Sequence, residues 1–284
     1  MCRFTFYMGS PIRVNSLITE PRHSLIHQSF ESKEREEPLN GDGFGLAWYK
    51  PNLTEEPGLF KSITPAWSNK NLFELCNILE TPCLLAHVRA ATQRLAVAEN
   101  NCHPFKNGRF AFMHNGDIGG FANIKRMVIE SLSDEAYHSI LGSTDSEHFF
   151  AVFLDEMMKQ PDQGLNGMAE AMLTALGRIT RLTERHCKGE YNYLNMVVTN
   201  GEAAIAIRFT TDPNLDADTM YLSQGRKYIC ENGVCKMIDP DDSHKAVLIS
   251  SEPLSNDSAW TMVGVNKIVS IASGDVVGQS NISL

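Results

Sequence analysis

A cysteine at the second position is the first residue of this sequence whose surroundings suit chemistry. The chain begins Met1-Cys2-Arg3, and methionine aminopeptidases remove an initiator methionine that precedes a small residue. Removal leaves Cys2 with a thiol and a free α-amine. Because an α-amine has a pKa of about 7.7–8.0 and a thiol one of about 8.5, a proton can pass between them near neutral pH. Cys2 is therefore a candidate nucleophile with its own base, although a lone cysteine is more often a small buried apolar group.

Further polar residues of suitable types follow segments with the pattern of strands. Arg89 follows the apolar run 83–88, Asn115 and Gly116 follow the run 109–113, and Asp145 begins a helical pattern. A guanidinium can clamp an α-carboxylate through two parallel hydrogen bonds, and a carboxylate can hold an α-ammonium. An Asn amide and a glycine N–H can receive a developing oxyanion. Together with Cys2, this set suits the hydrolysis of an amide bond on an amino acid.

Each of these residues also has a simpler explanation. Arg89 is able to pair with any of 34 acidic residues, and a carboxylate such as Asp145 is favoured at a helix start by the helix dipole. An Asn-Gly pair is most often a turn, and histidines such as His87, His103 and His114 are usually structural. Only their joint occurrence in separated segments favours the catalytic interpretation.

The elements that must position these residues are predicted from periodicity. Apolar residues alternate with others over 3–8, which predicts a half-buried strand that fixes Cys2. The glycine-dense segment 40–45 continues as a strand and not as a helix, so it predicts a close backbone approach and not a dinucleotide loop. Pro21 to Gln28 predicts a short helix, and the charged run 31–37 predicts a solvated loop.

The middle of the chain has helical spacing, and its two ends have strand patterns. Helices are predicted over 69–80, from the capping box of Thr144 and Glu147 to about 158, and over 164–182. Strands are predicted over 194–199, 204–209, 220–222, 227–230, 234–238, 246–250 and 268–271. Strands, then helices, then strands, without repeats, predict a single α+β body with layered sheets.

Composition narrows the class of ligand. The chain has 284 residues and a net charge of −9 without a long basic run, which disfavours nucleic acid or an anionic membrane as a partner and favours a small molecule. The apolar runs are too short for a membrane span, and the start does not resemble a signal peptide, so we expect a cytoplasmic protein. Seven cysteines without a CxxC pair favour a reducing compartment. Cys230 and Cys235 flank a predicted hairpin turn and are interpreted as structural.

Five segments in this order carry a resemblance to a known family. They are Cys2 after Met1, His-Val-Arg-Ala-Ala-Thr at 87–92, His-Pro at 103–104, His-Asn-Gly at 114–116 and Ser-Thr-Asp-Ser-Glu at 143–147. The set resembles the glutaminase domain of class II glutamine amidotransferases, which are N-terminal nucleophile hydrolases. The resemblance implies a four-layer αββα sandwich and a single domain over residues 2–284.

The segment 40–45 and the Ser-Glu-Pro-Leu at 251–254 narrow the resemblance to a stand-alone subgroup. That subgroup includes the yeast glutathione-degrading subunit and the γ-glutamyl amidohydrolase of ergothioneine biosynthesis. No role is assigned to 251–254.

The resemblance also implies a role for each matching residue. Cys2 is the nucleophile, and Asn115 with the Gly116 N–H forms the oxyanion hole. Arg89 clamps the substrate carboxylate, Asp145 holds its ammonium, and Thr92 and His103 contact substrate or line the site. No metal or cofactor is implied.

Three hypotheses follow. The first is hydrolysis of the γ-amide of glutamine or a γ-glutamyl compound through a Cys2 thioester. In a variant of this hypothesis, the chain is a glutaminase subunit that passes ammonia to a separate synthase, or it works with a separate peptidase subunit. The second is a catalytically silent regulatory or γ-glutamyl-binding subunit. The third is a cysteine peptidase-like hydrolase with His103 as its base. The residues do not choose among glutamine, glutathione and larger γ-glutamyl thiols, and they do not give the oligomeric state.

Overall fold

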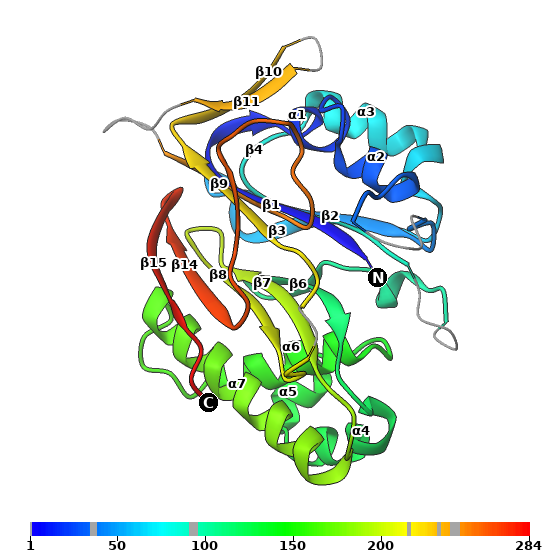
Figure 1. Ribbon diagram of the computed structural model, residues 1–284, viewed down its shortest axis with the longest axis vertical. Coiled ribbons are helices and arrows are strands. Elements are labelled where there is room, and N and C mark those ends of the chain that lie inside the picture. Colours follow the sequence, from blue (N-terminus) through cyan, green and yellow to red (C-terminus); the bar gives the residue numbers. More distant parts are fainter. Residues whose placement is uncertain (1, 35–38, 91–95, 215–216, 232–233, 239–244) are drawn as a thin grey trace.

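The first strand positions the start of the chain in the middle of a large sheet. The computed structural model describes residues 2–34, 39–90, 96–214, 217–231, 234–238 and 245–284 (Figure 1). Strand β1 (Arg3–Arg13) lies between β4 (Glu80–Val88) and β12 (Ala246–Ser250) and is antiparallel to both. The prediction of a strand that holds Cys2 is therefore confirmed.

Strand β1 is buried on both faces, which differs from the half-buried strand that the alternation predicts. Phe4 and Phe6 belong to a cluster between the two large sheets, whereas Tyr7 belongs to a second cluster on the other face. Arg3 and Thr5, at alternate positions with Tyr7, are also buried. The polar residues of the alternation thus mark a second interior face, where they find hydrogen-bond partners, and not a solvated one.

Two antiparallel sheets make up most of the described structure. Among the described residues, a seven-stranded sheet has the order β13-β9-β12-β1-β4-β2-β3, and a six-stranded sheet has the order β15-β14-β8-β7-β6-β5. The further strands of the first sheet are β2 (Phe44–Lys50), β3 (Thr54–Ser62), β9 (Tyr221–Gly225) and β13 (Trp260–Met262). The second sheet contains β5 (Phe105–Asn107), β6 (Phe110–Asp117), β7 (Tyr193–Thr199), β8 (Ala203–Thr210), β14 (Lys267–Ala272) and β15 (Asp275–Asn281).

Helices cover the outer face of each sheet (Figure 1). Beside the first sheet lie α1 (Asn15–Ile18), α2 (Leu25–Phe30) and α3 (Lys70–Ile78), which share an apolar cluster with its strands. The second sheet packs on α4 (Phe121–Glu130), α6 (Asp145–Met157) and α7 (Leu165–His186), with α5 (Asp134–His138) against α6. Short 3-10 helices lie at Ala66–Ser68 and Glu99–Asn101.

The local signals that set the helix starts are partly as predicted. Thr144 accepts a hydrogen bond from the Glu147 N–H and caps α6, but the Glu147 carboxylate accepts from Leu141 and Gly142 and so does not close the capping box. The short helix α2 begins after its cap Ser24, later than the predicted start at Pro21. Strands β3, β5, β13 and β15 were not predicted.

A separate hairpin of β10 (Lys227–Glu231) and β11 (Val234–Ile238) pairs Cys230 with Cys235 in register. The two cysteines form a disulfide with their Cα atoms 4.1 Å apart. Their prediction as structural residues that face each other agrees with this placement. The expectation that the cysteines are reduced does not hold for this pair.

Candidate active site

The start of β1 and the end of β4 lie side by side because the two strands are antiparallel. Arg3 is in register with Val88, so Cys2 comes next to the residues that follow β4. The Cys2 thiol donates to the carbonyl oxygen of Ala90, with sulfur and oxygen 3.6 Å apart. Figure 1 shows the N-terminus at the level where the two groups of strands approach each other.

Arg89 is held by the glycine-dense segment before β2. Its N–H donates to the Gly43 carbonyl at 2.8 Å, and its own carbonyl accepts from the Asp42 N–H at 2.9 Å. Gly43 has a φ of 115°, and a Cβ there would lie 2.6 Å from the Cys102 sulfur. The predicted close backbone approach is confirmed, and it leaves the side chain of Arg89 buried.

Asn115 and Gly116 lie within β6, which extends past the predicted strand-like run 109–113, and they do not form the turn of the simpler explanation. Asn115 is 1% exposed, and among the described residues neither its amide nitrogen nor its amide oxygen has a hydrogen-bond partner. Gly116 has a φ of 139°, and a Cβ at this position would lie 1.8 Å from the Tyr193 carbonyl oxygen. A glycine is therefore required beside a buried amide that is free to bind a ligand.

Asp145 joins the start of α6 to the segment after β6. One carboxylate oxygen accepts from the Ile118 N–H at 2.9 Å, and the other accepts from the Ser146 N–H at 2.8 Å. The Ser146 hydroxyl in turn bonds Nδ1 of His114 at 2.8 Å. These contacts bring Asp145 to the same end of β6 as Asn115.

His103 packs against His87, with the ring centroids 4.2 Å apart and the ring planes tilted by 31°. Neither ring nitrogen of His103 has a partner in the described part of the chain, and the residue is buried. Burial, together with the charges of neighbouring groups, lowers the pKa of His103 well below its usual value, so its imidazole is neutral and a weak base. This disfavours the hypothesis in which His103 is the base for Cys2. Thr92 lies outside the described residues.

The electrostatics of the Cys2 sulfur connect three of the site residues predicted from the sequence. Enclosure of the thiol raises its pKa to about 11, although the hydrogen bond to Ala90 and the positive charges of Arg89 and Arg3 act in the opposite direction. The negative charge of Asp145 raises it further. Cys2, Arg89 and Asp145 are therefore within electrostatic reach of one another. The thiol is protonated at neutral pH and needs a base before it can attack.

Two residues near Cys2 were not among the predicted site residues. Arg3 bonds the Cys2 carbonyl, and Glu252 binds Arg3. The sequence signal for Arg3 was an arginine within a predicted, largely apolar strand. The signal for Glu252 was its place in the segment 251–254, to which no role had been assigned. Among the described residues, no group of three or more His, Cys, Asp and Glu side chains is arranged to hold a metal ion.

The described residues thus form an α+β fold of two large antiparallel sheets, with a cysteine before a central strand and, among those residues, a buried Asn115 amide without a hydrogen-bond partner. The chain belongs to the class II glutamine amidotransferases, because the model of that family matches residues 17–283. The expectation of an enzyme of this family is thereby confirmed. In the part of the chain that the structure describes, no helix is long and apolar enough to span a membrane.

Two relatives whose names state an activity are similar to this chain over more than half of its length. The chain is 38% identical to the probable glutamine amidotransferase DUG3 of Saccharomyces cerevisiae, over 95% of this chain and 82% of the relative. It is 28% identical to the gamma-glutamyl-hercynylcysteine sulfoxide hydrolase of Mycobacterium tuberculosis, over 60% of this chain and 72% of the relative. At least one relative is therefore named as a hydrolase of a γ-glutamyl compound.

Solved structures share the fold. A glutamine aminotransferase class-II domain protein from Silicibacter pomeroyi matches with a TM-score of 0.69 and 25% identity, over 100% of both chains. The glutamine phosphoribosylpyrophosphate amidotransferase of B. subtilis matches with a TM-score of 0.58 and 13% identity, over 100% of this chain and 50% of that one.

Proposed function

We propose that this chain hydrolyses the γ-amide bond of a γ-glutamyl compound or of glutamine through a thioester on Cys2. The observation that carries the proposal is the buried side-chain amide of Asn115, which has no partner among the described residues. A buried amide without a partner costs about 1–3 kcal/mol, so its presence at the end of β6 favours a role in binding. Family membership supplies the reaction class.

The proposed reaction begins with proton transfer from the Cys2 thiol to the α-amine that methionine removal liberates. The thiolate attacks the γ-carbonyl carbon, and the carbonyl oxygen becomes an oxyanion. Asn115 Nδ2 and the Gly116 N–H donate to that oxyanion. The carbon–nitrogen bond then breaks, and the ammonium of Cys2 returns its proton to the leaving amine. Water attacks the thioester, which releases glutamate and restores the thiol.

Substrate binding is assigned to two charged residues. The Arg89 guanidinium has the geometry for a bidentate pair with the α-carboxylate of the substrate. Asp145 Oδ1 accepts from both the N–H and the hydroxyl of Ser146, whereas Oδ2 accepts from the Ile118 N–H and keeps a lone pair for the α-ammonium. His103, a neutral ring, and Thr92 match positions that contact substrate or line the site in the family, and we assign both to that role.

We propose in addition that the two sheets and their helices form the four-layer αββα sandwich of N-terminal nucleophile hydrolases, as a single domain over 2–284. The succession of three apolar clusters supports this assignment. One lies between helices and the first sheet, one between the two sheets, and one between the second sheet and its helices.

The names of the relatives support both substrate classes. The relative at 38% identity is named a probable glutamine amidotransferase, and the relative at 28% identity is named for a γ-glutamyl sulfoxide. A direct test measures glutamate release from glutamine, glutathione and other γ-glutamyl peptides, after mass spectrometry has established that Met1 is absent. We expect glutamate release from at least one of these compounds, and the comparison of their kcat/KM values identifies the preferred substrate.

The matched variants are Cys2→Ala and Cys76→Ala. Both remove a free thiol, but Cys76 is fully buried in α3, away from the site. Cys2→Ala should reduce glutamate release to background, and Cys76→Ala should retain it. Unchanged release by Cys2→Ala would exclude the thioester mechanism. A wild-type protein without Met1 that releases no glutamate from any of these compounds would instead favour the silent regulatory subunit.

A further inference from the structure

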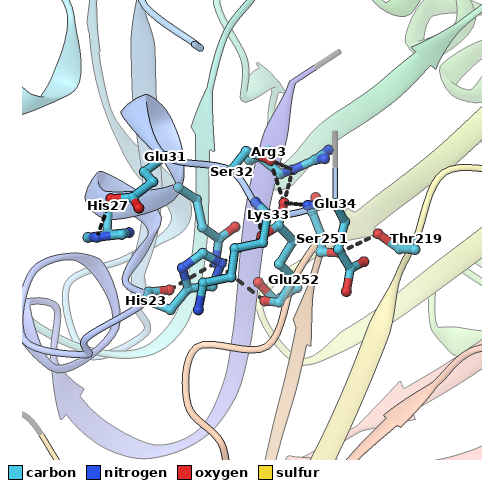
Figure 2. Close-up of polar contacts among 12 residues, drawn as sticks. Arg3, His23, His27, Glu31, Ser32, Lys33, Glu34, Thr219, Ser251 and Glu252 are labelled. Atoms are coloured by element: carbon cyan, nitrogen blue, oxygen red, sulfur yellow. Dashed lines mark hydrogen bonds and ion pairs between the residues drawn. The ribbon is translucent and has the colours of Figure 1, made fainter. Parts of the chain in front are cut away.

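Glu252 is a buried carboxylate that follows β12 and lies outside the proposed reaction. It is 1% exposed. Its oxygens accept hydrogen bonds from five groups: Nε of Arg3 at 2.8 Å, the ring Nε2 of His23 at 2.6 Å, the Ser32 hydroxyl at 2.5 Å, and the backbone N–H groups of Lys33 at 3.0 Å and Glu34 at 3.3 Å. Figure 2 shows these groups converging on the carboxylate.

The donors come from three separate stretches of the chain. Arg3 begins β1, His23 precedes α2, and residues 32–34 lie in the charged run that the sequence predicted to be a solvated loop. That prediction is wrong for Ser32, which is buried. Lys33 and Glu34 are exposed as predicted, but their backbone N–H groups bind the carboxylate. The charged side chains of this run predict solvent exposure and do not indicate that its backbone N–H groups bind Glu252.

Glu252 is ionised in the folded protein. Burial by itself raises the pKa of this carboxyl group, but the hydrogen bonds from His23, Ser32 and the Lys33 N–H and the charge of Arg3 outweigh it and lower the pKa. A buried ion pair whose remaining lone pairs are satisfied is stable in place, whereas removal of one partner leaves an uncompensated charge. Glu252 therefore holds the Arg3 guanidinium in one position.

The Arg3 guanidinium connects this carboxylate to the proposed nucleophile. Its Nε donates to Glu252, and its Nη1 donates to the backbone carbonyl of Cys2 at 2.9 Å. The guanidinium is planar and rigid, so the direction of one arm fixes the direction of the other. Ser251 strengthens the connection, because its N–H donates to the Phe4 carbonyl at 3.0 Å and its hydroxyl accepts from the Phe4 N–H at 3.1 Å.

We propose that Glu252 is a positioning residue for the N-terminal cysteine and acts on it through Arg3. The inference rests on the proposed function, in which Cys2 attacks the substrate. Residue 2 is the first residue of the processed chain, and the end of a chain frays unless neighbouring groups hold it. The hydrogen bond from Arg3 fixes the Cys2 carbonyl and with it the directions of the amine and the thiol.

The first test is the kinetics of Glu252→Gln. The variant keeps the shape of the side chain and removes its charge, so Arg3 loses its fixed partner. We expect kcat to fall by about 10- to 100-fold, because misplacement of a reacting group by about 1 Å can cost about 100-fold, and KM to change by less than about threefold. Rates are expressed per Cys2 thiol, counted by mass spectrometry on the folded fraction isolated by size-exclusion chromatography, so that unfolded protein does not contribute. A wild-type kcat in folded Glu252→Gln would overturn the inference.

Asp155→Asn is the matched control. Asp155 is also a buried carboxylate, and it pairs with Lys159 at 2.9 Å and Arg178 at 2.7 Å, but it lies in α6 outside the site. Loss of its charge should lower stability without changing kcat per thiol. If both variants lowered kcat equally, the effect of Glu252 would be structural, and the positioning role would be excluded.

A double-mutant cycle with Arg3→Lys tests the path of the effect, and the Arg3→Lys single variant remains available if Glu252→Gln does not fold. Lysine keeps the charge but lacks the second arm that reaches the Cys2 carbonyl. Arg3→Lys should lower kcat to a similar extent, and Glu252→Gln should then add less than about twofold in that background. A wild-type kcat for Arg3→Lys, or fully additive effects, would overturn the inference.

The two proposals fail separately. Activity in Cys2→Ala would remove the proposed function itself. An inactive Cys2→Ala beside fully active Arg3→Lys and Glu252→Gln would remove only the positioning role.

Discussion

Replacement of Asn115 by alanine should separate activity from stability. If the amide donates one of two hydrogen bonds to the oxyanion, its loss should lower kcat by about 10²–10³-fold, equivalent to about 2.7–4 kcal/mol of transition-state stabilisation. Stability should behave differently. Among the described residues the amide makes no hydrogen bond, so alanine breaks none in the free enzyme.

The free energy of unfolding should therefore stay the same or rise. An unpaired buried amide carries a desolvation penalty of about 1–3 kcal/mol, and alanine removes that penalty at the expense of a small cavity. Asn195, in register with Asn115 on β7, provides the matched control. It is equally buried and its amide oxygen also lacks a partner among the described residues, but its amide nitrogen donates to the Asp218 carbonyl at 2.7 Å and to the Thr219 carbonyl at 3.3 Å.

Asn195→Ala should thus lose about 1–3 kcal/mol of stability and keep most of its activity. The assays are steady-state glutamate release and urea unfolding on the same preparations. A wild-type kcat in Asn115→Ala would refute the interpretation of Asn115 as an oxyanion donor. A loss of activity in Asn115→Ala together with a loss of stability as large as that of Asn195→Ala would also refute it. A rise in KM at constant kcat would indicate ground-state binding and not oxyanion stabilisation.

Three further predictions concern charged groups. Arg89→Lys should raise KM by about 10- to 100-fold with a smaller change in kcat, because lysine cannot form the bidentate pair with the substrate carboxylate. Steady-state kinetics measure both constants, and an unchanged KM would show that another residue binds the carboxylate. An uncleaved N-terminal extension should leave the Cys2 thiol with a pKa of about 11, whereas the free ammonium of the processed chain should lower it. Alkylation rates measured against pH give both midpoints, and equal midpoints would contradict the proximity of amine and thiol. For Asp155, burial raises the pKa, but hydrogen bonds from Lys159 and Arg178 outweigh it, and the pKa is lowered on folding. The stability it contributes is therefore present above its unfolded pKa of about 3.9 and is lost as the pH falls through the lower folded value. Denaturant unfolding between pH 7 and 3 should show that the difference in unfolding free energy between wild type and Asp155→Asn becomes smaller toward acidic pH. A difference that does not change with pH would refute the assignment.

Local pattern was sufficient for the elements that carry the candidate site. The alternation at 3–8 predicted β1, the apolar run 83–88 predicted the end of β4, and the Thr144 signal predicted the start of α6. These features depend on neighbours two to four residues apart, which the sequence displays directly. The five ordered motifs likewise predicted the family, which the family match confirms. The roles of the individual residues stay predictions.

Long-range pairing decided what the sequence left open. An Asn-Gly pair is typical of a turn, yet Asn115 and Gly116 lie in β6. Gly116 lies against the Tyr193 carbonyl on β7, where a Cβ would not fit, and the Asn115 side chain is buried beside it. The edge strands β3 and β15 carry exposed residues on both faces and therefore lack the alternation that local pattern requires. Neither outcome is visible without the partner strand.

The sequence by itself determined that a cysteine at position two precedes a strand and that an arginine, an asparagine with a glycine, and an aspartate follow other elements in a family-specific order. Only the tertiary structure decided that Glu252 lies against Arg3, because the two residues are 249 positions apart. Residue type and short spacing record which groups are available and how the backbone nearby folds. The register of antiparallel strands and the burial of charge decide which of those groups meet.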